Sequence, residues 1–240
     1  MLTRFLKPET RYARRMARIA RWDRELAGPI DRAHAWANML FVDHGVFRVL
    51  YPNLGRVSEE LWRSSQPSPG QIARLARAGL RTIVNVRGGR EHGSWPLERE
   101  ACERHGVALV DVVLRSREPP SPEAIGRVAV TVQQIAYPAL VHCKSGADRA
   151  GLFAALYLIL RKGATVAEAR SQLALRFGHF RHAKTGILDA FLDAYEAGGE
   201  AKGLSLEAWI SDGYDPEALA RGFKPTLWST LIADRLLRRE

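Results

Sequence analysis

Short apolar runs alternate with amphipathic stretches through the middle of the chain. Three runs are rich in β-branched residues and short enough for buried strands: RTIVNV at 81–86, GVALVDVVL at 106–114 and PALVHC at 138–143. Apolar residues at helical spacing predict helices over about 69–79, 96–105, 121–136, 150–160, 165–176 and 185–197. Strands separated by helices pair mainly in parallel. We therefore expect an α/β fold with a central, mainly parallel sheet flanked by helices.

The two ends of the chain depart from this alternation. The segment 36–57 mixes aromatic and polar residues, and we expect it to pack across the sheet edge, with no chemistry assigned to Asp43-His44-Gly45. Residues 203–240 have a helical pattern. We therefore predict a basic helical N-terminal extension over 1–50, a central domain over 51–200 and a helical C-terminal extension over 201–240.

The N-terminal extension carries much of the chain's positive charge. Residues 1–24 hold eight basic and two acidic residues, which gives +6 of the chain's net +10. On a helix, most arginines lie opposite one apolar stripe, formed by Tyr12, Met16, Ile19, Trp22 and Leu26. Such a helix either packs its stripe on the domain or lies on an acidic partner or anionic lipid. No aromatic stacking pattern accompanies the arginines, so we expect no nucleic-acid partner.

Composition bounds the class of protein. Hydrophobic residues make up 46% and charged residues 26% of the 240 residues, and no run approaches the roughly 18 apolar residues of a membrane span. No apolar signal-peptide core follows the first residues. We expect a cytoplasmic protein that contacts the inner membrane surface, if at all, through residues 1–27. Only Cys102 and Cys143 are present, so neither a disulfide framework nor a metal site is expected.

The segment HCKSGADRAG, residues 142–151, has the strongest chemical pattern. Cys143 ends a predicted strand and Arg149 begins the next helix, whose N-terminus offers free N–H groups and a positive dipole to an anion. The small residues between them can form a cradle of N–H groups for an oxyanion: Ser145, Gly146 and Ala147. Arg149 can bind two of the anion's oxygens. The positive field of Arg149 and of the helix N-terminus also favours the thiolate form of Cys143. The pattern predicts a nucleophile facing a bound phosphate.

These residues resemble the His-Cys-x5-Arg loop of the cysteine-dependent phosphatases, the protein tyrosine and dual-specificity superfamily. The segment LWRSSQPSPGQIARLARAGLRTIVNVRG is similar to the early part of compact bacterial and plant members, so the resemblance covers roughly residues 57–197. It implies a dual-specificity-phosphatase-like fold. It also implies that Cys143 attacks phosphorus and forms a cysteinyl phosphate, that Arg149 binds the phosphate, and that His142 organises the loop. No metal or other cofactor is implied.

Two departures from the family pattern bear on turnover. The position after Arg149, usually serine or threonine with a hydroxyl that supports the leaving sulfur, is Ala150 here. The general acid is also open: Glu118 lies on the Pro-rich loop before the cysteine, and Asp148 matches atypical relatives with aspartate before the arginine. Asp111 is a third candidate. Each carboxylate also has a structural reading, as a helix cap, a solvated group or a sheet partner.

Weaker candidates surround the loop. Arg87 resembles an arginine that ends a core strand near the active site in related bacterial enzymes, or it is an ordinary surface residue. Lys144 adds charge that favours polyanionic substrates, or it points to water, and Lys184 and Thr185 are possible supports for water or substrate.

The expected substrate is protein phosphotyrosine or phosphoserine/threonine. The alternative substrate is a phosphorylated lipid of the phosphoinositide or phosphatidylglycerophosphate type. Two other classes stay open: a catalytically impaired phosphate-binding module, and a rhodanese-type sulfurtransferase.

Overall fold

The computed structural model describes residues 8–225, which form two compact units. The helical unit comprises the chain up to Tyr51 with Pro67–Gly79 and Gly89–Ala108. The sheet unit comprises Pro52–Gln66, Leu80–Gly88 and the chain from Leu109 onward. The N-terminal segment thus shares its unit with two helices from the middle of the chain. The predicted domain limits at residues 50 and 200 stay a prediction.

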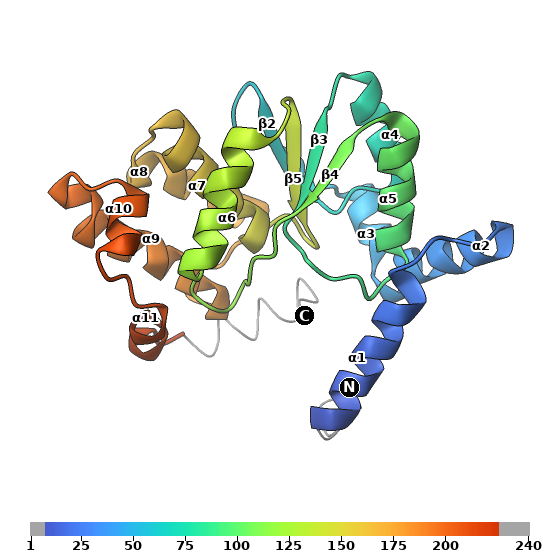
Figure 1. Cartoon of the computed structure of the whole chain (residues 1–240), viewed down its shortest axis with the longest axis horizontal. Coiled ribbons are helices and arrows are strands. Elements are labelled where there is room, and N and C mark those ends of the chain that lie inside the picture. The colour runs from blue at the N-terminus through green and yellow to red at the C-terminus, as the bar shows by residue number, and fades with distance from the viewer. Residues whose placement is uncertain (1–7, 226–240) are drawn as a thin grey trace. The chain divides into compact units, whose positions relative to one another are not determined.

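A five-stranded sheet with the order β1-β2-β5-β3-β4 is the centre of the sheet unit (Figure 1). The strands are β1 (Gly55–Arg56), β2 (Leu61–Ser65), β3 (Thr82–Asn85), β4 (Ala108–Asp111) and β5 (Ala139–Cys143). Both β2 and β3 pair with β5 in parallel, and β1 is antiparallel to β2 at the edge. The predicted mainly parallel sheet is confirmed. Strand β4 ends at Asp111 and is shorter than the predicted 106–114, although Val112 N still donates to Asn85 O and Leu114 N to Val86 O beyond it.

The helices of the sheet unit gather on one side of the sheet (Figure 1). They are α6 (Pro122–Gln134), α7 (Asp148–Lys162), α8 (Val166–Ala169), α9 (Ile187–Gly198), α10 (Leu206–Ser211) and α11 (Pro216–Gly222), with 3-10 turns at Arg170–Gln172, Leu175–Phe177, Lys184–Gly186 and Glu200–Lys202. Their apolar faces and the strands form one core, in which Phe153, Leu156 and Phe191 are fully buried. The helix predicted over 165–176 is shorter than expected: α8 ends at Ala169, a 3-10 turn follows it, and the carbonyl of Gln172 at the end of that turn accepts from the Arg63 side chain. The predicted helical pattern of 226–240 lies outside the described residues.

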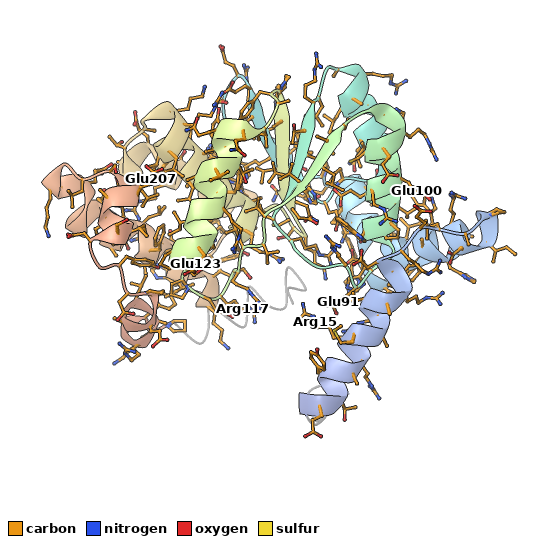
Figure 2. The ribbon with its side chains drawn as sticks, viewed as in Figure 1. Arg15, Glu91, Glu100, Arg117, Glu123 and Glu207 are labelled. Atoms are coloured by element: carbon orange, nitrogen blue, oxygen red, sulfur yellow. The ribbon has the colours of Figure 1, made fainter. Side chains whose placement is uncertain are left out.

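The helical unit contains α1 (Pro8–Trp22), α2 (Pro29–Ala37), a π-helical turn (Asn38–Val42), α3 (Gly45–Leu50), α4 (Pro69–Arg77) and α5 (Ser94–His105). Its small core joins α1 to α2 and α5 through Trp22, Leu26, Ala35, Met39 and Leu97. Arg15 also donates to Glu91 at 2.8 Å, and the two side chains point toward each other in Figure 2. The predicted basic helix is therefore present, and its C-terminal end is packed.

Asp43 is a buried anchor of the helical unit. Its Oδ2 accepts from Arg48 Nη2 at 2.9 Å and from Ser94 Oγ at 2.7 Å, and its side chain is fully buried. His44 beside it adopts a left-handed backbone at φ 57°, and a Cβ on Gly45 would lie 2.5 Å from Met39 O. The Asp43-His44-Gly45 segment thus has a structural role.

Candidate active site

The loop over residues 143–149 joins the end of β5 to the start of α7. Cys143 is the last residue of β5 and is only 1% exposed, while α7 begins at Asp148. Gly146 has φ +75°, and a Cβ there would lie 2.6 Å from the backbone of Ser64 and Ser65. Glycine alone fits this left-handed position against the end of β2. The predicted strand–loop–helix arrangement is present.

Arg63 of β2 holds the loop from outside. Its side chain is fully buried, and Nη2 donates to Gly146 O at 2.6 Å and to Ala147 O at 2.8 Å. Nη1 donates to the carbonyl of Gln172, and the guanidinium carbon lies 3.9 Å from the centre of the Phe177 ring. Burial lowers the pKa of Arg63 to about 10, so it stays charged at neutral pH.

Two further donors hold the preceding loop carbonyls. Asn53 Nδ2 donates to Ser145 O at 2.9 Å, and the Gln66 N–H donates to Lys144 O at 3.3 Å. Arg63 binds the next two carbonyls. The four successive carbonyls of residues 144–147 therefore all accept hydrogen bonds from donors outside the loop. In a trans peptide the N–H points opposite to its C=O. The N–H groups of residues 145–148 are therefore directed inward, where they can bind an oxyanion.

Arg149 lies against the end of β3. Its Nη1 donates to Arg87 O at 3.1 Å. Arg87 is only 5% exposed, its N–H donates to Asn85 Oδ1, and its Nη1 donates to Gln66 Oε1 at 2.5 Å. The reading of Arg87 as an ordinary surface residue is wrong, because these contacts bury it beside Arg149.

Other predicted loop residues have distinct surroundings. His142 is fully buried, and its Nδ1 lies 3.4 Å from Cys143 O. Lys144 and Ser145 are half-buried. Thr185 is buried with its hydroxyl 3.4 Å from Phe180 O, whereas Lys184 is exposed.

The candidate acids differ in their placement. Asp148 is buried, and its Oδ1 accepts from His179 Nδ1 at 2.7 Å. Glu118 and Asp111 are exposed, Glu118 on the segment between β4 and α6 and Asp111 at the end of β4. The structure thus brings Asp148 to the start of α7 beside Arg149, and it leaves Glu118 at the surface. All three stay candidates.

His179 forms the centre of a buried charged cluster. Its Nε2 donates to Asp189 Oδ2 at 2.6 Å, while Nδ1 donates to Asp148. Burial by itself would lower the pKa of His179, but hydrogen bonds to two carboxylates raise it above its ordinary value. The cluster ties the first residue of α7 to the start of α9. A cavity of about 310 Å³ adjoins the cluster and not the 143–149 loop, and is lined by Arg170, Leu173, Leu175, His179, Phe180, Arg181, His182 and Asp189.

The sequence did not indicate the roles of Arg63, Asn53 and His179. Arg63 stands inside the segment WRSSQ that carries the family resemblance, and this is the one signal that could have found it. His179 was visible only as one of several basic residues in RFGHFRH. Within residues 8–225, no group of three or more His, Cys, Asp or Glu side chains is arranged to hold a metal ion.

Comparison with known proteins identifies relatives of this chain. A family model described as "DSP-PTPase phosphatase fused to NAD+ Kinase" matches residues 51–187. The chain is 29% identical over 195 residues to the dual specificity protein phosphatase TpbA of Pseudomonas aeruginosa PAO1, covering 75% of this chain and 78% of TpbA. It is 33% identical over 103 residues to a beta-lactamase hydrolase-like protein of Xylella fastidiosa, covering 41% and 23% of the two chains.

The crystal structure of P. aeruginosa TpbA is 26% identical with a TM-score of 0.47, covering 64% of this chain and 89% of that one. Human DUSP28 is 23% identical with a TM-score of 0.43, covering 63% and 96%.

Proposed function

The chain belongs to the DSP-PTPase phosphatase family and is a cysteine-dependent phosphatase, and we propose that its substrates are proteins phosphorylated on tyrosine, serine or threonine. The observation that carries this proposal is the 143–149 loop, whose carbonyls are held from outside beside Cys143 and Arg149. The description of its relative TpbA as a dual specificity protein phosphatase supports the choice of a protein substrate.

The arrangement suits a two-step transfer of the phosphoryl group. In the first step the Cys143 sulfur bonds phosphorus, the P–O bond to the leaving group breaks, and the leaving oxygen takes a proton from a carboxylic acid. In the second step a water oxygen bonds phosphorus, the S–P bond breaks with its electrons on sulfur, and the water proton goes to the carboxylate. The inward N–H groups and Arg149 hold the phosphoryl oxygens through both steps. Glu118 and Asp148 are the proposed acids, with Asp111 third.

A lipid phosphate is the alternative substrate. Lys144 is half-buried within the loop, where its charge favours a substrate with several phosphates. A phosphate-binding module without turnover would keep the same loop, and a sulfurtransferase would use Cys143 on thiosulfate. The products of the reaction separate these classes. A protein phosphatase releases phosphate from phosphopeptides, a lipid phosphatase releases phosphate from lipids, a sulfurtransferase forms thiocyanate, and a binding module forms no product.

Variants of the two central residues test the proposal. Cys143→Ser should abolish hydrolysis of an aryl phosphate without added metal while still binding phosphate analogues, because the N–H groups remain. Arg149→Lys should lower kcat/KM by about 100-fold, since an ammonium group cannot replace the planar fork. Substantial turnover by Cys143→Ser, or wild-type turnover by Arg149→Lys, would contradict the mechanism. Release of phosphate from phosphoinositides but not from phosphopeptides would favour the lipid alternative.

We also propose that the helical unit contacts an anionic membrane at the cytoplasmic surface. Helix α1 carries five arginines and one glutamate, and Tyr12 and Met16 of its stripe are exposed. Trp22 and Leu26 are instead packed in the core of the unit, so only the first half of the stripe is available. Exposed apolar side chains continue along the unit: Ile30, Trp36, Phe41, Val42, Val46, Phe47, Val49, Leu50 and Tyr51.

Basic and apolar groups together match an anionic bilayer, because guanidinium groups meet headgroups while apolar side chains enter the acyl boundary. Exposed apolar side chains that gather on one surface often mark an interaction site. No helix of residues 8–225 has the length and apolar character needed to cross a membrane.

A further inference from the structure

Ser65, the last residue of β2, has a buried hydroxyl beside the nucleophile. In the parallel ladder, Arg63 is the partner of Val141 and Ser65 is the partner of Cys143. Partners on neighbouring parallel strands point to the same face of the sheet, and their strands lie about 4.8 Å apart. The core contacts agree with this pairing, because Leu61 of β2 and Val141 and Cys143 of β5 belong to the same core cluster as residues of α7. The Ser65 side chain therefore lies next to that of Cys143.

The Ser65 hydroxyl is also chemically available. Its side chain is 2% exposed, and Oγ has no hydrogen-bond partner among the described residues. A buried hydroxyl without a partner costs free energy, so such groups in native structures usually have a role. The adjacent Ser64 differs, because its Oγ donates to Ser65 O at 2.6 Å.

Among the described residues, the first turn of α7 contains no hydroxyl side chain. Ala150, in the first turn of α7, is fully buried in the same core cluster as Cys143. Its methyl group cannot donate a hydrogen bond. The sulfur must nevertheless leave phosphorus as an anion in the second step of the reaction, and a nearby donor would stabilise that charge.

We propose that the Ser65 hydroxyl donates a hydrogen bond to the Cys143 sulfur and stabilises it as the leaving group. The inference rests on the proposed phosphatase reaction. A small rotation about the Ser65 Cα–Cβ bond brings Oγ toward Sγ once the sulfur is negatively charged. As water attacks phosphorus, the S–P bond breaks, its electron pair stays on sulfur, and the Ser65 O–H remains intact as the donor.

Rapid-mixing kinetics on a nitrophenyl phosphate test this role. In Ser65→Ala the first turnover should release nitrophenol at nearly the wild-type rate, while the steady-state rate falls about tenfold, as expected for one hydrogen bond to a charged group. Phosphorylated enzyme should then accumulate and be seen by mass spectrometry. A defect in folding alone would lower both phases together.

Rescue and control variants complete the test. Ala150→Ser in the Ser65→Ala protein should restore the steady-state rate, because it offers a hydroxyl from the opposite side. Ser64→Ala, which removes the neighbouring buried hydroxyl, should leave the ratio of the first-turnover rate to the steady-state rate unchanged. If Ser65→Ala does not fold, Ser65→Thr and Ser65→Val make the same comparison with matched shapes.

The proposal would be overturned if the ratio of the first-turnover rate to the steady-state rate were the same in wild type and in every variant lacking the Ser65 hydroxyl. Failure of Ala150→Ser to restore the rate would do the same. Turnover by Cys143→Ser would instead contradict the proposed function.

Discussion

The side chains that shape the catalytic loop come mostly from outside it. Arg63 is fully buried and charged, and burying a guanidinium costs several kcal/mol unless its donors are satisfied. The contacts of its two terminal nitrogens with Gly146 O, Ala147 O and Gln172 O offset much of that cost and fix the loop at the same time, while Nε has no partner among the described residues. One side chain thus couples the stability of the sheet unit to the orientation of the N–H groups.

The two leading acids can be separated by the leaving group. An alkyl phosphate needs protonation of its leaving oxygen much more than an aryl phosphate does, so loss of the acid should lower kcat/KM on the alkyl substrate by about 100-fold or more and on the aryl substrate far less. Asp148→Asn and Glu118→Gln should be measured on both substrates. An equal loss of kcat/KM on both substrates would instead indicate a structural role. For Asp148 that role is its hydrogen bond with His179. If neither variant depends on the leaving group, Asp111 is next.

Elements differ in how far local sequence predicts them. Strand β5 and helix α7 follow from an apolar run and a helical pattern next to each other in the chain, so Cys143 and Arg149 were placed correctly from the sequence. The contact of Arg63 with Gly146 spans 83 residues, and no local pattern indicates it. The bond from Arg63 to the Gln172 carbonyl, after the end of α8, spans 109 residues and is equally invisible to a local pattern. Burial of Arg87 likewise depends on Gln66 from the end of β2.

The link between α7 and α9 should make stability depend on pH. The pKa of His179 in the folded protein is raised by Asp148 and Asp189, above its unfolded value of about 6.5. Its stabilising contribution is therefore fully present below about pH 6.5 and is lost as pH rises through the raised folded pKa, by up to about 1.4 kcal/mol per pH unit.

Urea unfolding of wild type and His179→Asn from pH 6 to 9 measures this contribution. The difference between the two free energies of unfolding should narrow as pH rises. The exposed neighbour His182→Asn is the matched control and should follow wild type throughout. A difference that stays constant or grows with pH would contradict an imidazolium at position 179.

At the scale of the whole molecule, the two units differ in their surfaces. Most of the exposed large apolar side chains of the described chain lie between residues 12 and 51, whereas the sheet unit contributes only Leu54, Val113, Val130 and Leu175. The helical unit also carries the basic helix α1. A phosphatase bound through this unit would meet membrane-associated phosphoproteins in two dimensions, so its substrate choice would depend on location as well as on the loop.

Vesicle binding by the full chain tests this arrangement. Burying one leucine or phenylalanine side chain in an apolar phase contributes about 1.5–3 kcal/mol, so Phe41→Asp or Leu50→Asp should weaken binding to anionic vesicles at least tenfold. Leu175→Asp, which changes an exposed leucine of the sheet unit, should bind like wild type. Binding should also fall as salt rises, because the arginines of α1 contribute through screened charge. Equal binding to neutral and anionic vesicles, or equal binding by all variants, would rule the membrane contact out. If the wild-type chain binds no vesicles but Leu50→Asp changes its sedimentation in solution, the apolar surface serves self-association instead.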